Sequence, residues 1–116
     1  MEITRIYTDS DGQSNFEICP ILMEEKSEIG FFSTPKTNVK SLRFQNVYPH
    51  QEWEFHSADS KAYITILEGT LELEVSNGKK KNFTVGDVIF LEDQSGQGHK
   101  LKTFEHAVCG MVVHFD

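Results

Sequence analysis

Residues 56–69, HSADSKAYITILEG, and residues 86–99, GDVIFLEDQSGQGH, decide the fold. Each contains a short apolar run of the length of a strand. Between them, residues 71–75 read LELEV, so apolar and acidic side chains alternate and one face of this strand is buried while the other meets water. An Asn77-Gly78 pair follows and predicts a two-residue type I′ hairpin turn.

Period-two alternation dominates the rest of the chain, and helical periodicity is almost absent. Pro20, Pro35 and Pro49 punctuate the N-terminal half, and proline is typical of sheet edges and bends. Many short strands separated by turns predict an all-β protein, built as an antiparallel sandwich or barrel. Besides those above, strands are expected over residues 16–23, 30–33, 39–47 and 108–115.

Length and charge limit what the chain can be. Its 116 residues, 38% of them hydrophobic, form one core, so we expect a single domain over 1–116. The formal net charge of −7 repels phosphate backbones, which argues against a nucleic-acid partner. No apolar run is long enough for a membrane span, and the N-terminus does not resemble a signal peptide. We therefore expect no membrane partner and a cytoplasmic location.

The segment from His50 to Gly69 resembles the first signature motif of the cupin superfamily, G-x5-H-x-H-x3,4-E-x6-G. His56 matches the first motif histidine, and Gly69 matches the closing glycine. Ala58 stands at the second histidine position, and Ala62 stands at the glutamate position. His50 occupies the opening glycine. The spacing of the motif is kept, but two of its metal ligands are missing.

The segment from Gly86 to Thr103 resembles the second cupin motif, G-x5-P-x-G-x2-H-x3-N. Gly86 matches the first glycine, Glu92 stands at the proline position, and a longer turn leads to His99 at the histidine position. Thr103 replaces the closing asparagine. The turn itself, EDQSGQGH over residues 92–99, is similar to that of a group of small single-domain bacterial cupins. The resemblance implies a single cupin-like jelly-roll barrel with degenerate metal-binding motifs.

Strand parity places several side chains inside this barrel. Lys100 and Lys102 face water, so His99 and its alternate neighbours face inward. If the family orientation holds, the alternate residues from Ala62 onward also line the barrel. A mostly apolar interior with few polar groups suits a small-molecule site. The expected lining residues are Ala58, Ala62, Ile64, Ile66, Leu101, Thr103 and Trp53.

His56 and His99 are the two motif ligands that survive, and their role has alternatives. They form a metal pair or an acid–base pair at the barrel mouth, or they are half-buried histidines bonded to backbone. A catalytic metal usually takes three protein ligands, so a divalent cation would need a substitute such as Glu54, which shares parity with His56 in an extended segment. Solvated loop charge is the other interpretation of Glu54. Glu92 and Asp93 are a second source of carboxylate ligands, or they are turn residues whose side chains hydrogen-bond the local backbone.

The resemblance does not choose a function, because cupins include dioxygenases, isomerases, epimerases and lyases. Three classes stay open: a metal-dependent enzyme acting on a small oxygen-rich or carboxylated metabolite, a metal-free ligand-binding or sensing module, and a barrel that serves mainly for self-association. A homodimer is expected, because residues 30–33, GFFS, form an aromatic segment with few charges to protect it.

Overall fold

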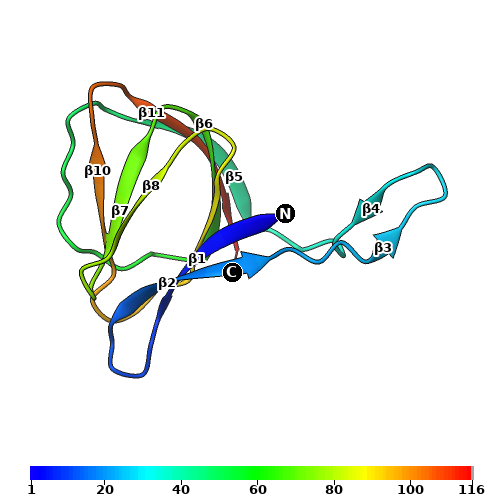
Figure 1. Ribbon diagram of the computed structural model, residues 1–116, viewed down its shortest axis with the longest axis horizontal. Helices are drawn as coiled ribbons and strands as arrows, with labels where there is room; N and C mark the ends of the chain where they lie inside the picture. The colour runs from blue at the N-terminus through cyan, green and yellow to red at the C-terminus, as the bar shows by residue number, and fades with distance from the viewer. Residues whose placement is uncertain (116) are drawn as a thin grey trace.

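The computed structural model describes residues 1–115, which form eleven strands and no helix (Figure 1). The all-β prediction is therefore confirmed. Since these residues contain no helix, none of them forms a helical membrane span. The strands are β1 (Glu2–Thr8), β2 (Ser14–Pro20), β3 (Glu25–Lys26), β4 (Phe32–Ser33), β5 (Ser41–Val47), β6 (Ala62–Glu68), β7 (Leu71–Val75), β8 (Lys80–Phe83), β9 (Val88–Leu91), β10 (His99–Thr103) and β11 (Val108–His114).

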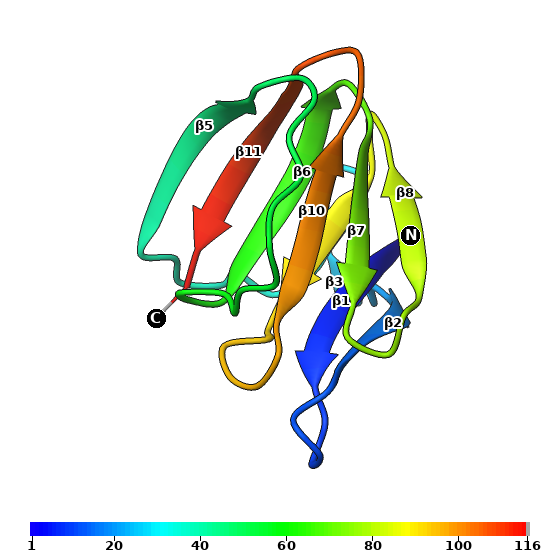
Figure 2. The same ribbon diagram turned by 90° about the vertical axis from the view of Figure 1, so that its left-hand side faces the viewer.

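Two sheets face each other across one core (Figure 2). The larger has the order β2-β1-β9-β6-β11-β5, and the smaller has the order β10-β7-β8. In β7 the alternate apolar side chains, Leu71, Leu73 and Val75, are buried, as the LELEV stretch predicts. The arrangement is that of a jelly roll whose sheets do not close. The core comprises Ile6, Val47, Ile66, Leu71, Leu73, Val75, Phe83, Ile89, Leu91, Leu101 and Val108.

One strand pair departs from the expected antiparallel pattern. β1 pairs with β9 in parallel, with Thr4 opposite Ile89 and Ile6 opposite Leu91. The sequence of β1, EITRIYT, is rich in β-branched residues, yet β1 was not among the expected strands. The partner of a parallel strand must come from a distant part of the chain, so no turn signal next to β1 in the sequence indicates this pairing.

The turn between β7 and β8 is longer than the predicted type I′ turn. The Gly78 amide donates to the Val75 carbonyl (3.0 Å), and the Val75 amide donates to the Lys79 carbonyl (3.0 Å). Only Gly78 has a positive φ, of 91°, whereas a type I′ turn would need one at Asn77 as well. The loop thus has three residues. The Asn77 side chain satisfies the Lys79 amide instead (2.9 Å).

Replacing Gly78 by Val is expected to lower the free energy of unfolding by roughly 1–2 kcal/mol, because a β-branched residue is strained at positive φ. A Cβ at Gly78 would meet no atom within 4 Å, so the cost comes from the backbone alone. Urea denaturation measures it. Lys79→Val is the matched control at a neighbouring exposed residue without positive φ, and equal midpoints for the two variants would contradict the prediction.

A separate hairpin leaves the two sheets. Residues 21–40, called the arm below, connect β2 to β5, and their strands β3 and β4 pair only with each other. Figure 1 shows the arm projecting away from both sheets.

Candidate functional site

The chain before β6 runs along the free edge of β10 and brings the two motif histidines together (Figure 2). The His56 amide donates to the His99 carbonyl (3.1 Å), and the His99 amide donates to the His56 carbonyl (2.9 Å). The two imidazole rings lie with their centroids 4.6 Å apart. The predicted approach of His56 and His99 is therefore present in the structure.

Gly98 makes this approach possible. Its φ is +75°, and a Cβ there would overlap the backbone carbonyl of His56. Only glycine tolerates both conditions. The Ser14 hydroxyl, fully buried, donates to the Gly98 carbonyl (2.6 Å) and holds this part of the loop against β2.

Asp93 orients the ring of His99. Nδ1 of His99 lies 2.5 Å from Oδ2 of Asp93, and both side chains are buried. An ionised carboxylate only accepts hydrogen bonds, so with Asp93 ionised Nδ1 carries the proton and donates it. In the neutral ring Nε2 then keeps its lone pair. The other carboxylate oxygen, Oδ1, is buried and has no hydrogen-bond partner among residues 1–115.

His56 is fixed in the same tautomer by a different acceptor. Its Nδ1 donates to the Glu54 carbonyl (3.0 Å), which can only accept. The side chain of His56 is exposed, and the Trp53 ring lies beside it with centroids 5.7 Å apart. Both imidazoles therefore commit Nδ1 to the protein and leave Nε2 available to a bound molecule.

A cavity of about 260 Å³ lies between the sheets next to this histidine pair. It is slightly smaller than the usual range for drug-sized ligands, which favours a small metabolite. Most of its wall is apolar and comes from β6, β7, β9, β10 and β11. Among the residues expected at the site, those that line the cavity are His56, His99, Trp53, Ala58, Ala62, Ile64 and Leu101.

Three expected residues lie outside the cavity wall. Ile66 is almost fully buried in the core. Thr103 is also buried, and its hydroxyl donates to the Tyr48 carbonyl (2.7 Å) and accepts from the Gln51 amide (2.9 Å), so it fastens the loop after β5. Glu54 is exposed and contributes only its backbone carbonyl to His56.

A register shift explains the position of Glu54. Glu52 pairs with Lys102 and His56 pairs with His99, so four steps along one segment oppose three steps along β10. One extra residue, as in a β-bulge, breaks the alternation that would have put Glu54 and His56 on one face. Trp53 lines the cavity instead.

Several polar residues of the cavity were not predicted from the sequence, among them Arg43 and His114. Arg43 on β5 lines it, and its side chain makes no hydrogen bond or ion pair within residues 1–115. His114 on β11 also lines it, with Nδ1 2.9 Å from the Ser60 hydroxyl. The alternation Arg43, Gln45, Val47 was the available signal, since Val47 is buried in the core.

The donor set does not fit a catalytic metal. Among residues 1–115 no group of three or more His, Cys, Asp or Glu side chains is placed to hold a metal ion. The family positions that would supply further ligands are Ala58 and Ala62. His56 and His99 alone fall short of the three protein ligands that catalytic sites generally use.

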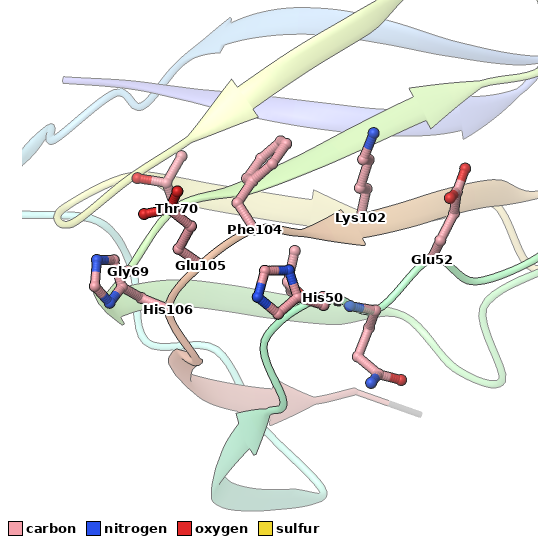
Figure 3. Close-up of a pocket in the computed structure, with 10 residues that line it drawn as sticks. His50, Glu52, Gly69, Thr70, Lys102, Phe104, Glu105 and His106 are labelled. Atoms are coloured by element: carbon pink, nitrogen blue, oxygen red, sulfur yellow. Dashed lines mark hydrogen bonds between the residues drawn. The ribbon is translucent and has the colours of Figure 1, made fainter.

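A wider surface groove of about 530 Å³ lies beyond the Thr103 end of β10 (Figure 3). Figure 3 shows His50 and His106 on the two loops that border it. His50 has a φ of 56° at the position of the motif glycine, and its amide donates to the Phe104 carbonyl (2.8 Å). Apart from Thr103 its walls are exposed or half-buried, so this groove is the weaker candidate for a specific site.

Comparison with solved structures settles the fold. A cupin-2 domain containing protein from Shewanella frigidimarina NCIMB 400 matches with a TM-score of 0.54 and 18% identity, over 70% of this chain and 74% of that chain. A Cupin 2 conserved barrel domain protein from Salinispora arenicola CNS-205 matches with a TM-score of 0.53 and 23% identity, over 72% and 71%. This chain folds as a small cupin domain.

The polyketide cyclase RemF from Streptomyces resistomycificus also matches this cupin domain, with a TM-score of 0.54 and 24% identity. The match covers 63% of this chain and about half, 51%, of RemF. No protein-family profile matches the sequence, and no curated protein matches it either. At these identities the likeness shows the fold alone.

Proposed function

We propose that the cupin cavity binds a small organic carboxylate and that His99, oriented by Asp93, transfers a proton on the bound molecule. The observation that carries this proposal is the buried Asp93–His99 pair beside an apolar cavity. A carboxylate that fixes the tautomer of a histidine leaves the far nitrogen free to act as a general base. RemF, a polyketide cyclase, is a solved example of an enzyme on this fold.

The side chain of Arg43 favours an anionic ligand. Its guanidinium lines the cavity and has no partner among the described residues, whereas Asp59, the carboxylate of the lining, is exposed. A guanidinium presents a planar fork that matches a carboxylate. An anion bound there would place the rest of the molecule against the apolar wall formed by Leu71, Ile89 and Leu101.

The position of His99 favours proton transfer over simple binding. A ligand-binding wall needs no buried carboxylate, and burying Asp93 costs free energy that one hydrogen bond to His99 offsets only in part. Such pairs are typical of acid–base sites. The alternative, a binder without catalysis, is favoured by the missing motif ligands at Ala58 and Ala62.

Binding is tested with benzoate and its neutral analogue benzamide, followed by the backbone amide signals in NMR. Benzoate is expected to shift signals of cavity residues such as His56 and Ala62, and benzamide to shift them much less at equal concentration. Arg43→Gln should weaken benzoate binding about tenfold or more, the effect of losing one charge-assisted hydrogen bond.

Lys79→Gln is the matched control, because it removes the same charge from the exposed β7–β8 loop. It should leave benzoate binding unchanged. Equal shifts from benzamide, or shifts confined to the groove around His106, would contradict the proposal.

Proton transfer is tested with pyruvate in D₂O. His99 Nε2 would remove a methyl proton, the electron pair would move to the carbonyl oxygen, and a deuteron exchanged onto the imidazole would return to carbon. Loss of the methyl signal in NMR should be faster than in buffer and should slow in His99→Gln. Saturable binding of pyruvate without exchange would instead support the non-catalytic module.

A further inference from the structure

Arg43 and His114 lie next to each other in the wall of the cavity. Arg43 of β5 pairs with Val112 of β11, and His114 follows Val112 two residues later on the same face of the sheet. Such diagonal neighbours in an antiparallel pair are close enough for long side chains to reach one bound molecule. Both residues line the cavity. A group bound to the Arg43 guanidinium therefore has the His114 imidazole beside it.

Ala62 leaves room for a ligand beside this imidazole. β6 pairs with β11 so that Ala62 lies opposite His114. Ala62 stands where the first cupin motif has a glutamate, whose carboxylate would compete for the ring of His114. A side chain that ends at Cβ leaves both the space and the hydrogen bond to a bound molecule.

The Ser60 hydroxyl holds the ring of His114 without fixing its tautomer. Oγ of Ser60 lies 2.9 Å from Nδ1 of His114. A hydroxyl can donate as well as accept, whereas the ionised carboxylate of Asp93 only accepts. When Ser60 donates to Nδ1, the proton of the neutral ring is on Nε2. His114 can thus present an N–H donor to the cavity, while His99 presents a lone pair.

The loop that carries Ser60 is fixed at both ends. The Ala58 amide donates to the Asp93 carbonyl (2.9 Å), and the Phe115 amide donates to the Lys61 carbonyl (2.8 Å). The Ser60 hydroxyl therefore has a defined place between the loop that positions the base and the end of β11.

The cavity runs from an accessible end to a buried one. Arg43, Ser60 and His114 also border a surface pocket of about 430 Å³, which residues 40–42 complete. Arg43 is exposed, whereas His99 is buried. A carboxylate costs least free energy to bind where it keeps some contact with water. This polarity orients an acid with its carboxylate at Arg43 and its carbon chain toward His99.

We propose that the cavity is specific for α-keto acids and that His114 recognises the keto group. The inference rests on the proposed carboxylate site at Arg43. The keto oxygen of such an acid lies on the carbon next to the carboxylate, so it faces the diagonal neighbour of Arg43. Nε2 of His114 donates a hydrogen bond to this oxygen, and the β carbon points inward to His99.

The same contact assists the proposed proton transfer. Nε2 of His99 takes a proton from the β carbon, the C–H electron pair forms a carbon–carbon double bond, and the carbonyl pair moves to the keto oxygen. His114 stabilises the negative charge that develops on this oxygen and keeps its own proton. Return of the proton from His99, or of a deuteron in D₂O, restores the ligand without another reactant.

Specificity is measured as the dissociation constants of α-ketobutyrate and butyrate, which differ only in the keto group. The parent is expected to bind α-ketobutyrate about fivefold to tenfold more tightly, the effect of one hydrogen bond. His114→Phe should remove this difference. His106→Phe is the matched control, because it removes an imidazole from the exposed groove of Figure 3 and should leave the difference unchanged.

Infrared spectroscopy tests the contact without any turnover. The carbonyl stretching band of bound α-ketobutyrate should lie at lower frequency in the parent than in His114→Phe, because the hydrogen bond polarises the carbonyl group. Circular dichroism checks that each variant keeps the β spectrum of the parent.

Deuterium exchange at the β carbon of α-ketobutyrate tests the role of His114 in the reaction. His114→Phe should lower kcat about a hundredfold with a smaller change in KM. His114→Gln places an amide donor near the position of Nε2 and should keep most of the rate. Ser60 is a positioning residue, so Ser60→Ala should lower kcat less than His114→Phe does, and Ser60→Thr should restore it.

The outcomes separate this inference from the proposed function. Keto-dependent binding through His114 without exchange would support the keto contact and overturn proton transfer by His99. Exchange that is unchanged in His114→Phe would keep the role of His99 and overturn that of His114. Equal losses in His114→Phe and His114→Gln would also overturn it, because a hydrogen-bond donor would then not suffice. Equal affinity of the parent for the two acids would overturn the specificity, and binding of neither acid would overturn both proposals.

Discussion

Gly98→Ala is expected to be among the most damaging single substitutions in this protein, lowering the free energy of unfolding by roughly 3–5 kcal/mol. Two costs combine. The methyl group would sit at a positive φ of 75°, and it would overlap the carbonyl carbon and oxygen of His56. Neither atom is the end of a flexible side chain, so the backbone of one segment must move.

Urea denaturation measures the loss, and Gly86→Ala separates the two costs. Gly86 has a φ of 92°, but a Cβ there would meet nothing within 4 Å. Gly86→Ala should therefore lower the free energy of unfolding by only about 1–2 kcal/mol, the cost of backbone strain alone. If the two variants lose the same amount, the contact between Gly98 and His56 is not as close as the structure has it. Because Gly98 holds the segments of His56 and His99 together, the variant should also lose benzoate binding.

Asp93→Asn is expected to have the second large effect. It removes a charge-assisted hydrogen bond between two buried groups and should cost roughly 1.5–3 kcal/mol of stability. It should also change the imidazole itself. Without the carboxylate, nothing obliges Nδ1 of His99 to carry the proton, so the ¹⁵N signals of the ring should move from one tautomer toward a mixture.

Asp59→Asn is the matched control, because Asp59 also borders the cavity but is exposed. It should leave both the unfolding midpoint and the His99 tautomer unchanged. If Asp93→Asn keeps the parent tautomer and the parent rate of deuterium exchange into pyruvate, Asp93 is not a positioning residue and the proton-transfer proposal fails.

The sequence predicted that His56 and His99 lie together, but it did not predict that Asp93 is buried against His99. The spacing of the two motifs placed His56 and His99 together because motif spacing is a property of strands and register. Asp93 was recognised as a turn carboxylate, but its burial depends on how the 92–99 loop folds back, which no periodicity encodes. Arg43 was missed because the strand that carries it was assessed as a strand and not for its inward face.

Small irregularities account for the other differences. The loop at Asn77 has three residues, one more than the predicted two-residue turn. Between Glu52 and His56 the chain also has one extra residue relative to β10, and this residue turns Glu54 out of the site. A single insertion reverses which face every later side chain occupies, so parity arguments fail wherever a bulge intervenes. The core strands contain no such insertion between Leu71 and Val75, and there alternation predicted burial correctly.

The parallel pairing of β1 with β9 has a consequence for how the chain reaches this structure. β1 can pair early with β2 on one of its edges, but its other edge has to wait for β9, which lies between β1 and β6 in the large sheet and is one of the last strands made. Closing so long a loop is slow compared with forming hairpins such as β7–β8. During synthesis the small hairpins can form early, but His56 meets His99 only when almost the whole chain has emerged. Assembly of the cavity therefore comes late in the folding of this protein.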